Sequence, residues 1–172
     1  MRIKLIQGDI TKQRVDAVVN PANTKGHMGG GVAGALRRAV ADVVHRQAMR
    51  LATGKVGTAW LTPVENAPFK AIIHAATMAM DFKTNEKAIA SATRSAMAIA
   101  KEHGFKSVCF PAMGTGVGGF DPGEAARIMY REIAAFADDP EAPQDITIVL
   151  YDARTASAFK SALAGRELVD AD

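Results

Sequence analysis

The stretch over residues 20–34 constrains the fold of this chain more than any other part of it. A continuous β-branched apolar run at 15–19 leads into it and predicts a buried strand, and an amphipathic pattern leading out of it predicts a helix. Between the two lie five glycines and two asparagines. Glycines at a helix start let backbone N–H groups face an anion without a side chain in between. We therefore expect an anion cradle here, with a flexible ligand-free loop as the alternative.

Strand-like and helix-like segments alternate along the rest of the chain. The expected strands are 3–6, 15–19, 56–61, 70–75, 107–111 and 146–151, and the expected helices are 31–51, 86–103, one opened by Asp121-Pro122-Gly123-Glu124, and 155–163. This alternation predicts an α/β layered fold with a largely parallel sheet. Ligands of such folds bind where loops leave the carboxyl ends of strands, so two glycine loops and the Tyr151-Asp152 turn should meet in one crevice.

Length and composition point to one ordinary domain. The chain has 172 residues, 48% hydrophobic and 23% charged, and we expect a single domain over 1–172 with an ordered core at about 2–165 and a frayed tail. A net charge of +3 with scattered Lys and Arg argues against a nucleic-acid partner. The single cysteine, Cys109, lies in an apolar run and fits a reducing compartment. With neither a signal peptide nor a membrane-spanning run recognised in the sequence, we expect a cytoplasmic monomer that does not contact membranes.

The glycine loops do not match the common nucleotide fingerprints. Gly29, Gly31 and Gly34 formally satisfy G-x-G-x-x-G, but nine residues separate the first glycine from the preceding strand. A P-loop is excluded because no Gly-Lys-Ser/Thr follows either loop. Two glycine loops that face each other could instead hold a diphosphate between backbone N–H groups.

Five motifs in this order and spacing resemble the macro domain family, over residues 3–163. The motifs are Gly8-Asp9-Ile10-Thr11, Asn20-Pro21-Ala22-Asn23, Gly29-Gly30-Gly31-Val32-Ala33-Gly34, Pro111-Ala112 with Gly114-Thr115-Gly116-Val117-Gly118-Gly119, and Leu150-Tyr151-Asp152. The resemblance implies a three-layer α/β/α sandwich with a mixed, largely parallel sheet of about six strands. It also implies a crevice for ADP-ribose and no separate cofactor.

The resemblance further implies roles for individual residues. Asp9 would accept a hydrogen bond from the adenine amino group, the Ile10 N–H would meet a ring nitrogen, and Tyr151 would stack on the adenine. Asn23 would bind the distal ribose, whereas Asn20 would tie the loop to neighbouring backbone. The phosphate-binding loops and their neighbours would be Gly29, Gly30, Gly31, Val32, Gly114, Thr115, Gly116, Val117, Gly118, Gly119 and Phe120. The alternatives are a turn-capping role for Asp9 and a core position for Tyr151.

The sequence departs from the family pattern at the positions of catalysis. Hydrolytic members often carry Asp where this chain has Ala33, and many carry an aromatic residue at the position of Gly118, for which Phe120 is a possible substitute. Viral relatives place His where this chain has Met28, with His27 one residue earlier. The other histidines lack metal-ligand spacing, so no catalytic metal is expected. We therefore expect either substrate-assisted water attack at the distal ribose, with Asn23 orienting it, or His27 as base.

Four functions fit these observations to different degrees. The first is a hydrolase that removes ADP-ribose from an ester-linked protein side chain, nucleic-acid end or acetyl group. The second is a non-catalytic reader of ADP-ribose, which the missing aspartate favours. The third is an ADP-ribose 1″-phosphatase. The fourth, an RNA-binding module, is the weakest, because no basic stripe or interleaved aromatic residues are present.

Overall fold

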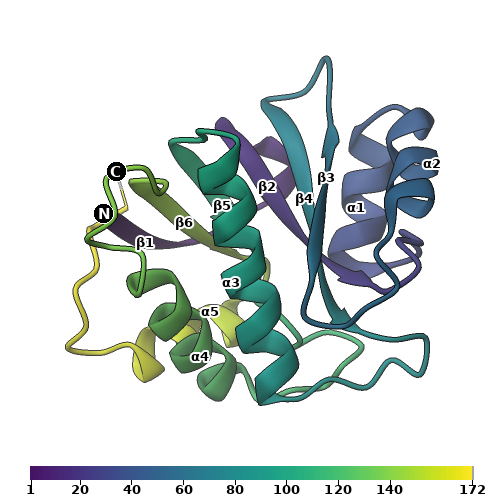
Figure 1. Cartoon of the computed structure of the whole chain (residues 1–172). Helices are drawn as coiled ribbons and strands as arrows, with labels where there is room; N and C mark the ends of the chain where they lie inside the picture. Colours follow the sequence, from purple (N-terminus) through teal and green to yellow (C-terminus); the bar gives the residue numbers. More distant parts are fainter. Residues whose placement is uncertain (172) are drawn as a thin grey trace.

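The computed structural model describes residues 1–171, which form a six-stranded sheet flanked by helices (Figure 1). The strands are β1 (Arg2–Gln7), β2 (Val15–Asn23), β3 (Ala59–Pro63), β4 (Phe69–Met78), β5 (Ser107–Phe110) and β6 (Asp145–Leu150). The helices are η1 (Ile10–Lys12, a 3₁₀ turn), α1 (Gly31–Ala39), α2 (Asp42–Leu51), α3 (Glu86–Glu102), α4 (Pro122–Ala134) and α5 (Ala153–Ala162).

The strand order is β1-β6-β5-β2-β4-β3, and only the β3–β4 pair is antiparallel. The first five strands in this order are therefore parallel, and their carboxyl ends lie at one edge of the sheet. This arrangement confirms the predicted mixed, largely parallel sheet of six strands.

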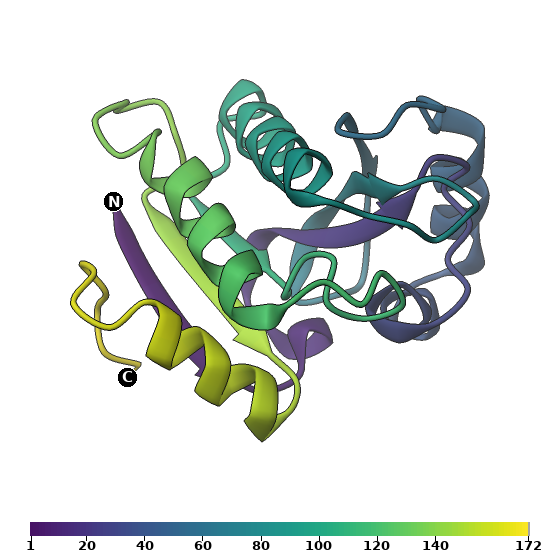
Figure 2. The same cartoon turned by 90° about the horizontal axis from the view of Figure 1, so that it is seen from below.

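Helices cover both faces of the sheet because successive strand residues point to opposite faces. Val19 and Ile73 join a cluster with residues of α3, α4 and α5, whereas their neighbours Val18 and Ile72 join a cluster with residues of α1 and α2. Figure 2 shows α1 and α2 (blue) well apart from α3, α4 and α5 (teal, green and yellow). The result is the predicted three-layer α/β/α sandwich.

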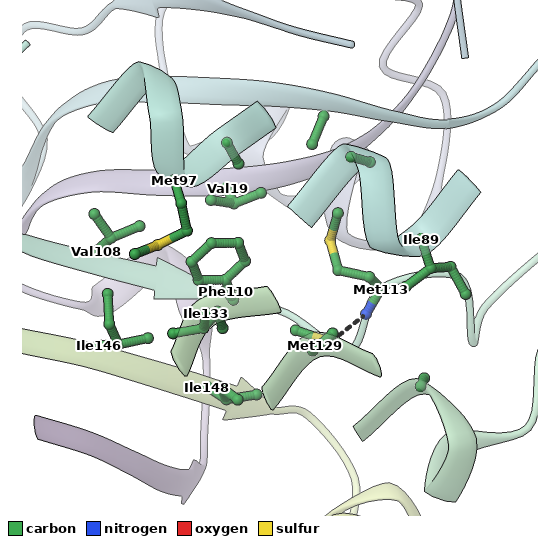
Figure 3. Close-up of a cluster of buried hydrophobic side chains, with 14 of the residues drawn as sticks. Val19, Ile89, Met97, Val108, Phe110, Met113, Met129, Ile133, Ile146 and Ile148 are labelled. Atoms are coloured by element: carbon green, nitrogen blue, oxygen red, sulfur yellow. Dashed lines mark hydrogen bonds between the residues drawn. The ribbon is translucent and has the colours of Figure 1, made fainter. Parts of the chain in front are cut away.

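Part of the larger cluster lies between β5, β6 and the helices α3 and α4 (Figure 3). Phe110 lies at its centre and is fully buried, with Met97 of α3 and Ile133 of α4 beside it. The backbone N–H of Met113 donates a hydrogen bond to the Met129 sulfur at 3.4 Å, which fixes the start of the second glycine loop against α4. This core holds the loops at the carboxyl edge in place.

The predicted helix over 31–51 is wrong in one respect, because it is two helices. Val40 and Ala41 are both extended and separate α1 from α2. The break lets Leu36 of α1 and Val44 of α2 pack on the same face of the sheet. A continuous helix of about 30 Å would carry its second half past that face. Val43, an apolar residue at helical spacing within the predicted helix, is 44% exposed.

Strand β2 continues four residues beyond its predicted end. Asn20 pairs with His74, and the strand ends at Asn23, after a bulge. Pairing between β2 and β5 is confined to Ala17 and Val18, so only β4 adjoins the strand at Pro21. A residue without a backbone N–H is tolerated where one side of the strand is unpaired. The sequence Asn20-Pro21-Ala22-Asn23 is therefore strand and not loop.

Residues 167–169, within the tail that we expected to fray, contact the rest of the protein. The Val169 N–H donates to the Ile3 carbonyl at 2.9 Å, and Leu168 packs on the main core. The Tyr130 hydroxyl donates to the Glu167 carbonyl at 3.4 Å. The tail thus covers the outer edge of β1.

Candidate functional site

Four parallel neighbours, β1, β6, β5 and β2, bring the predicted site residues into a row along one edge of the sheet. Asp9 follows β1, Tyr151 follows β6, the loop 111–121 follows β5, and Asn23 ends β2. Neighbouring strands lie about 4.8 Å apart, so the row extends over about 15 Å. The structure brings together segments that are more than a hundred residues apart in sequence.

Asp9 occupies the first position of the row and caps the 3₁₀ turn. Its Oδ1 accepts hydrogen bonds from the Thr11 N–H at 2.9 Å and from the Thr11 hydroxyl at 2.7 Å. These two bonds, the hydroxyl first, lower the pKa of Asp9 below its usual range. The turn-capping alternative is therefore true of Oδ1, whereas Oδ2 has no partner among residues 1–171. Ile10 is the first residue of η1, so its N–H has no partner within the helix.

Tyr151 is the most exposed large apolar side chain at this edge. It is 82% exposed and follows directly on β6, which ends at Leu150. The alternative that Tyr151 is a core aromatic is thereby excluded. An aromatic ring exposed to this extent next to Asp9 offers a face on which a flat ring can stack.

The first glycine loop presents the free N-terminus of α1. Gly30 is the N-cap residue, its backbone is extended, and no side chain caps the helix. A Cβ atom at Gly30 would have no neighbour within 4 Å. The N–H groups of the first turn, including that of Val32, therefore have no side-chain cap and carry the partial positive charge of the helix N-terminus.

The second glycine loop excludes an aromatic residue at position 118. A Cβ atom at Gly118 would lie 2.7 Å from Thr84 Cγ2 and 2.9 Å from the Gly114 carbonyl oxygen. Phe120 is half-buried and packs against the main core, so it does not replace an aromatic ring at Gly118. Val117 projects from the loop and is 75% exposed.

Asn23 has the loop-holding role that we expected of Asn20. Its Oδ1 accepts hydrogen bonds from the N–H groups of Lys25 at 3.1 Å and His27 at 3.2 Å, and its Nδ2 donates to the His27 carbonyl at 2.9 Å. These bonds fold the turn that leads into the glycine run. One Nδ2 hydrogen is left over for a ligand.

Asn20 is buried in the sheet, and its partner is a side chain that the sequence did not connect to it. Its Nδ2 lies 3.1 Å from Nδ1 of His74, whose Nε2 lies 2.8 Å from the Thr62 hydroxyl. Burial is the main reason that the pKa of His74 falls to about 3, with a smaller contribution from His45. The imidazole is therefore neutral, and its Nε2–H donates to Thr62 because Asn20 Nδ2 can only donate. Only strand register places these side chains together.

His27, and not Met28, faces the site. Met28 is 1% exposed and belongs to the core beneath α1 and α2, whereas His27 is exposed. The His27 ring lies edge-on to His45, with 5.2 Å between ring centroids. A Cβ atom at Gly29 would lie 3.6 Å from Nε2 of His27. The imidazole thus adjoins the start of the glycine run.

The described residues form neither a metal-binding cluster nor a membrane-spanning helix. Among residues 1–171, no three His, Cys, Asp or Glu side chains gather closely enough to hold a metal ion. No helix in this part of the chain combines the length and the apolar character needed to cross a membrane.

Comparison with known proteins gives consistent matches. A family model described as "Macro domain" matches residues 19–129. An uncharacterized protein of Aquifex aeolicus is 39% identical over 164 residues, which cover 95% of this chain and 98% of that protein. A Salmonella gallinarum protein named O-acetyl-ADP-ribose deacetylase is 34% identical, over 92% of each chain. The solved Oceanobacillus iheyensis macrodomain with ADP is 27% identical, with a TM-score of 0.82 over 92% of this chain and 88% of that one.

Proposed function

The chain belongs to the macro domain family, and from that premise we propose that it binds ADP-ribose along the carboxyl edge of its sheet. The observation that carries the proposal is the order of groups along that edge. An exposed aromatic ring and a carboxylate stand at one end, the second glycine loop lies in the middle, and the first glycine loop lies at the other end with an amide and an imidazole. Adenine, diphosphate and distal ribose follow one another in ADP-ribose in the same order.

In this arrangement each part of the ligand meets matching chemistry. Oδ2 of Asp9 accepts from the adenine amino group, the Ile10 N–H meets a ring nitrogen, and Tyr151 stacks on the ring. The diphosphate lies between the N-terminus of α1 and the second glycine loop, where N–H groups favour negative charge. The free Nδ2 hydrogen of Asn23 meets a hydroxyl of the distal ribose.

We further propose that the protein slowly hydrolyses ester-linked ADP-ribose without a metal. The deacetylase name of the Salmonella relative supports ester chemistry at the distal ribose. Ala33 supplies no carboxylate, so the water would be held between the diphosphate and loop backbone and aimed at C1″. A non-catalytic reader and a 1″-phosphatase are the alternatives.

Calorimetric titration with ADP-ribose and with AMP tests the binding proposal. We expect one-to-one binding of ADP-ribose and much weaker binding of AMP, because AMP lacks the second phosphate and the distal ribose. Equal affinities would contradict the row of three subsites. Incubation with ADP-ribose 1″-phosphate, followed by an assay for inorganic phosphate, tests the phosphatase alternative.

Replacing Asp9 separates its two roles. Asp9→Ala should weaken ADP-ribose binding by roughly 1.5–3 kcal/mol, the scale of a hydrogen bond to a charged group. Asp9→Asn keeps an acceptor for Thr11 and so keeps the turn, but replaces the free oxygen by an amide donor. We expect Asp9→Asn to bind ADP-ribose as poorly as Asp9→Ala while melting at the temperature of the unmutated protein. Full affinity in either folded variant would leave Asp9 as a turn residue only.

Hydrolysis should depend on Asn23 more than on His27. Asn23→Ala should slow release of ADP-ribose from a glutamate-modified protein by about 10- to 100-fold, because the distal ribose loses its orientation. His27→Ala should slow release less than about threefold, since a true general base would contribute about 10²–10⁴. Chelators should have no effect. An equal loss of hydrolysis rate in both variants would indicate that His27 is the general base. If the unmutated protein binds ADP-ribose but releases none from the modified protein, the non-catalytic reader is favoured.

A further inference from the structure

An open cleft of about 560 Å³ begins at the end of the row where Asn23 lies. Three segments meet there, namely the turn after β2, the end of α2, and the loop after β4. The Thr24 N–H donates to the Met78 carbonyl at 3.1 Å, and the Gly54 N–H donates to the Thr24 carbonyl at 3.2 Å, so backbone hydrogen bonds hold the segments together. The cleft is lined by Thr24, Lys25, His27, Met49, Ala52 and Met80.

His27 stands between this cleft and the glycine run. Its ring lines the cleft, and its Nε2 would lie 3.6 Å from a Cβ atom at Gly29. The ring is steadied by its edge-on contact with His45, which is only 4% exposed. A group attached to a sugar at the Asn23 end of the row would therefore pass His27 and enter the cleft.

The lining of the cleft has a specific chemical character. Met49 and Met80 are 40% and 41% exposed and present apolar surface to the cleft. Their flexible thioethers adapt to apolar side chains of different shapes. Lys25 carries the positive charge in the lining, and it is absent from the ion pairs of the described residues. The cleft therefore suits an apolar side chain next to an acidic group.

We propose that this cleft holds the peptide segment joined to C1″ of the distal ribose, and that it selects acidic peptides carrying an apolar side chain near the modified residue. This inference rests on the proposed binding of ADP-ribose, and it names the part of the substrate that lies beyond the sugar. The cleft is far larger than an acetyl group requires. The occupant is a polypeptide because the apolar methionines and Lys25 together match a side chain and a carboxylate.

The test compares ADP-ribose with a conjugate that cannot be hydrolysed. The probe is an acidic pentapeptide of glutamates with one leucine, joined at its central side chain to C1″ by a non-ester linkage. We expect calorimetry to give about tenfold tighter binding for the conjugate than for ADP-ribose, a gain on the scale of one buried apolar side chain less its ordering cost. Met49→Gln and Met80→Gln should each remove most of this gain and leave ADP-ribose affinity unchanged. Val43→Gln, at an exposed position on α2 outside the cleft, is the matched control and should keep the gain.

Reversing the charge of Lys25 sharpens the test. Lys25→Glu should abolish the tighter binding of the acidic conjugate and should bind more tightly a conjugate in which lysines replace the glutamates. Lys160→Glu, on α5, is the control and should leave both affinities unchanged. The inference is overturned if the unmutated protein binds ADP-ribose and the conjugate equally, or if the cleft variants weaken ADP-ribose itself. Failure of the unmutated protein to bind either probe would instead overturn the proposed function on which the inference rests.

Discussion

Gly30→Glu is expected to abolish ADP-ribose binding while the protein stays folded. The backbone at Gly30 is extended and a Cβ atom there meets nothing within 4 Å, so a side chain can be added without strain. The new carboxylate would lie at the free N-terminus of α1, where N–H groups and the helix dipole attract negative charge. It would occupy the place of a phosphate and repel the other, and we expect affinity to fall at least about 100-fold.

Two matched variants separate charge from bulk at this position. Gly30→Ala adds only a methyl group in open space and should keep most of the affinity. Gly30→Gln has the size of glutamate without its charge and should lose less affinity than Gly30→Glu. Calorimetry measures binding, and thermal unfolding checks that each variant is folded. Normal binding by folded Gly30→Glu would mean that the phosphates lie elsewhere.

His74→Gln is expected to destabilise the folded protein strongly. His74 is fully buried, hydrogen-bonded to Asn20 and Thr62, and stacked on Trp60 at 5.5 Å between ring centroids. Glutamine cannot fill the ring's volume or reach both partners. We expect the free energy of unfolding at pH 7.5 to fall by roughly 2–4 kcal/mol, from the cavity and the unpaired polar groups. Chemical denaturation measures this change.

The same residue gives the protein an acid sensitivity above the range of its carboxylates. The unfolded chain binds a proton at His74 below about pH 6.5. The folded chain binds it only near pH 3, because burial lowers the pKa of His74. The unfolded state therefore holds more protons in this window, and stability should fall by up to about 1.4 kcal/mol per pH unit as the pH decreases. The pKa of His45 is also lowered, chiefly by burial, and adds to the effect in the same direction.

Comparing slopes between pH 6.5 and 5 isolates the contribution of His74. His74→Gln should flatten the dependence of the unfolding free energy on pH, even though the variant is less stable throughout. An unchanged slope in His74→Gln would contradict the assignment of a neutral buried imidazole.

The sequence by itself determined the alternation of strands and helices and the placement of the two glycine loops. Apolar runs of β-branched residues alternate with helical patterns, and these local signals depend only on neighbouring residues. The cap at Asp121, whose carboxylate accepts from the Glu124 N–H at 2.9 Å, was predicted for the same reason. The glycine run, Asp9 and Tyr151 could likewise be assigned to strand ends from spacing alone.

Only the tertiary structure decided which of these residues meet and what each side chain does. Strand order brings Asp9 and Tyr151 together, since β1 and β6 are neighbours although they lie at opposite ends of the chain. Strand register places Asn20 beside His74, to which it is hydrogen-bonded, so that Asn23 and not Asn20 makes the hydrogen bonds that hold the loop. Neither Gly nor Pro lies at the break between α1 and α2. The chain breaks there because the packing of both helices on one face of the sheet outweighs local helix propensity. Contacts between distant segments are set by the whole fold, so no local pattern reveals them.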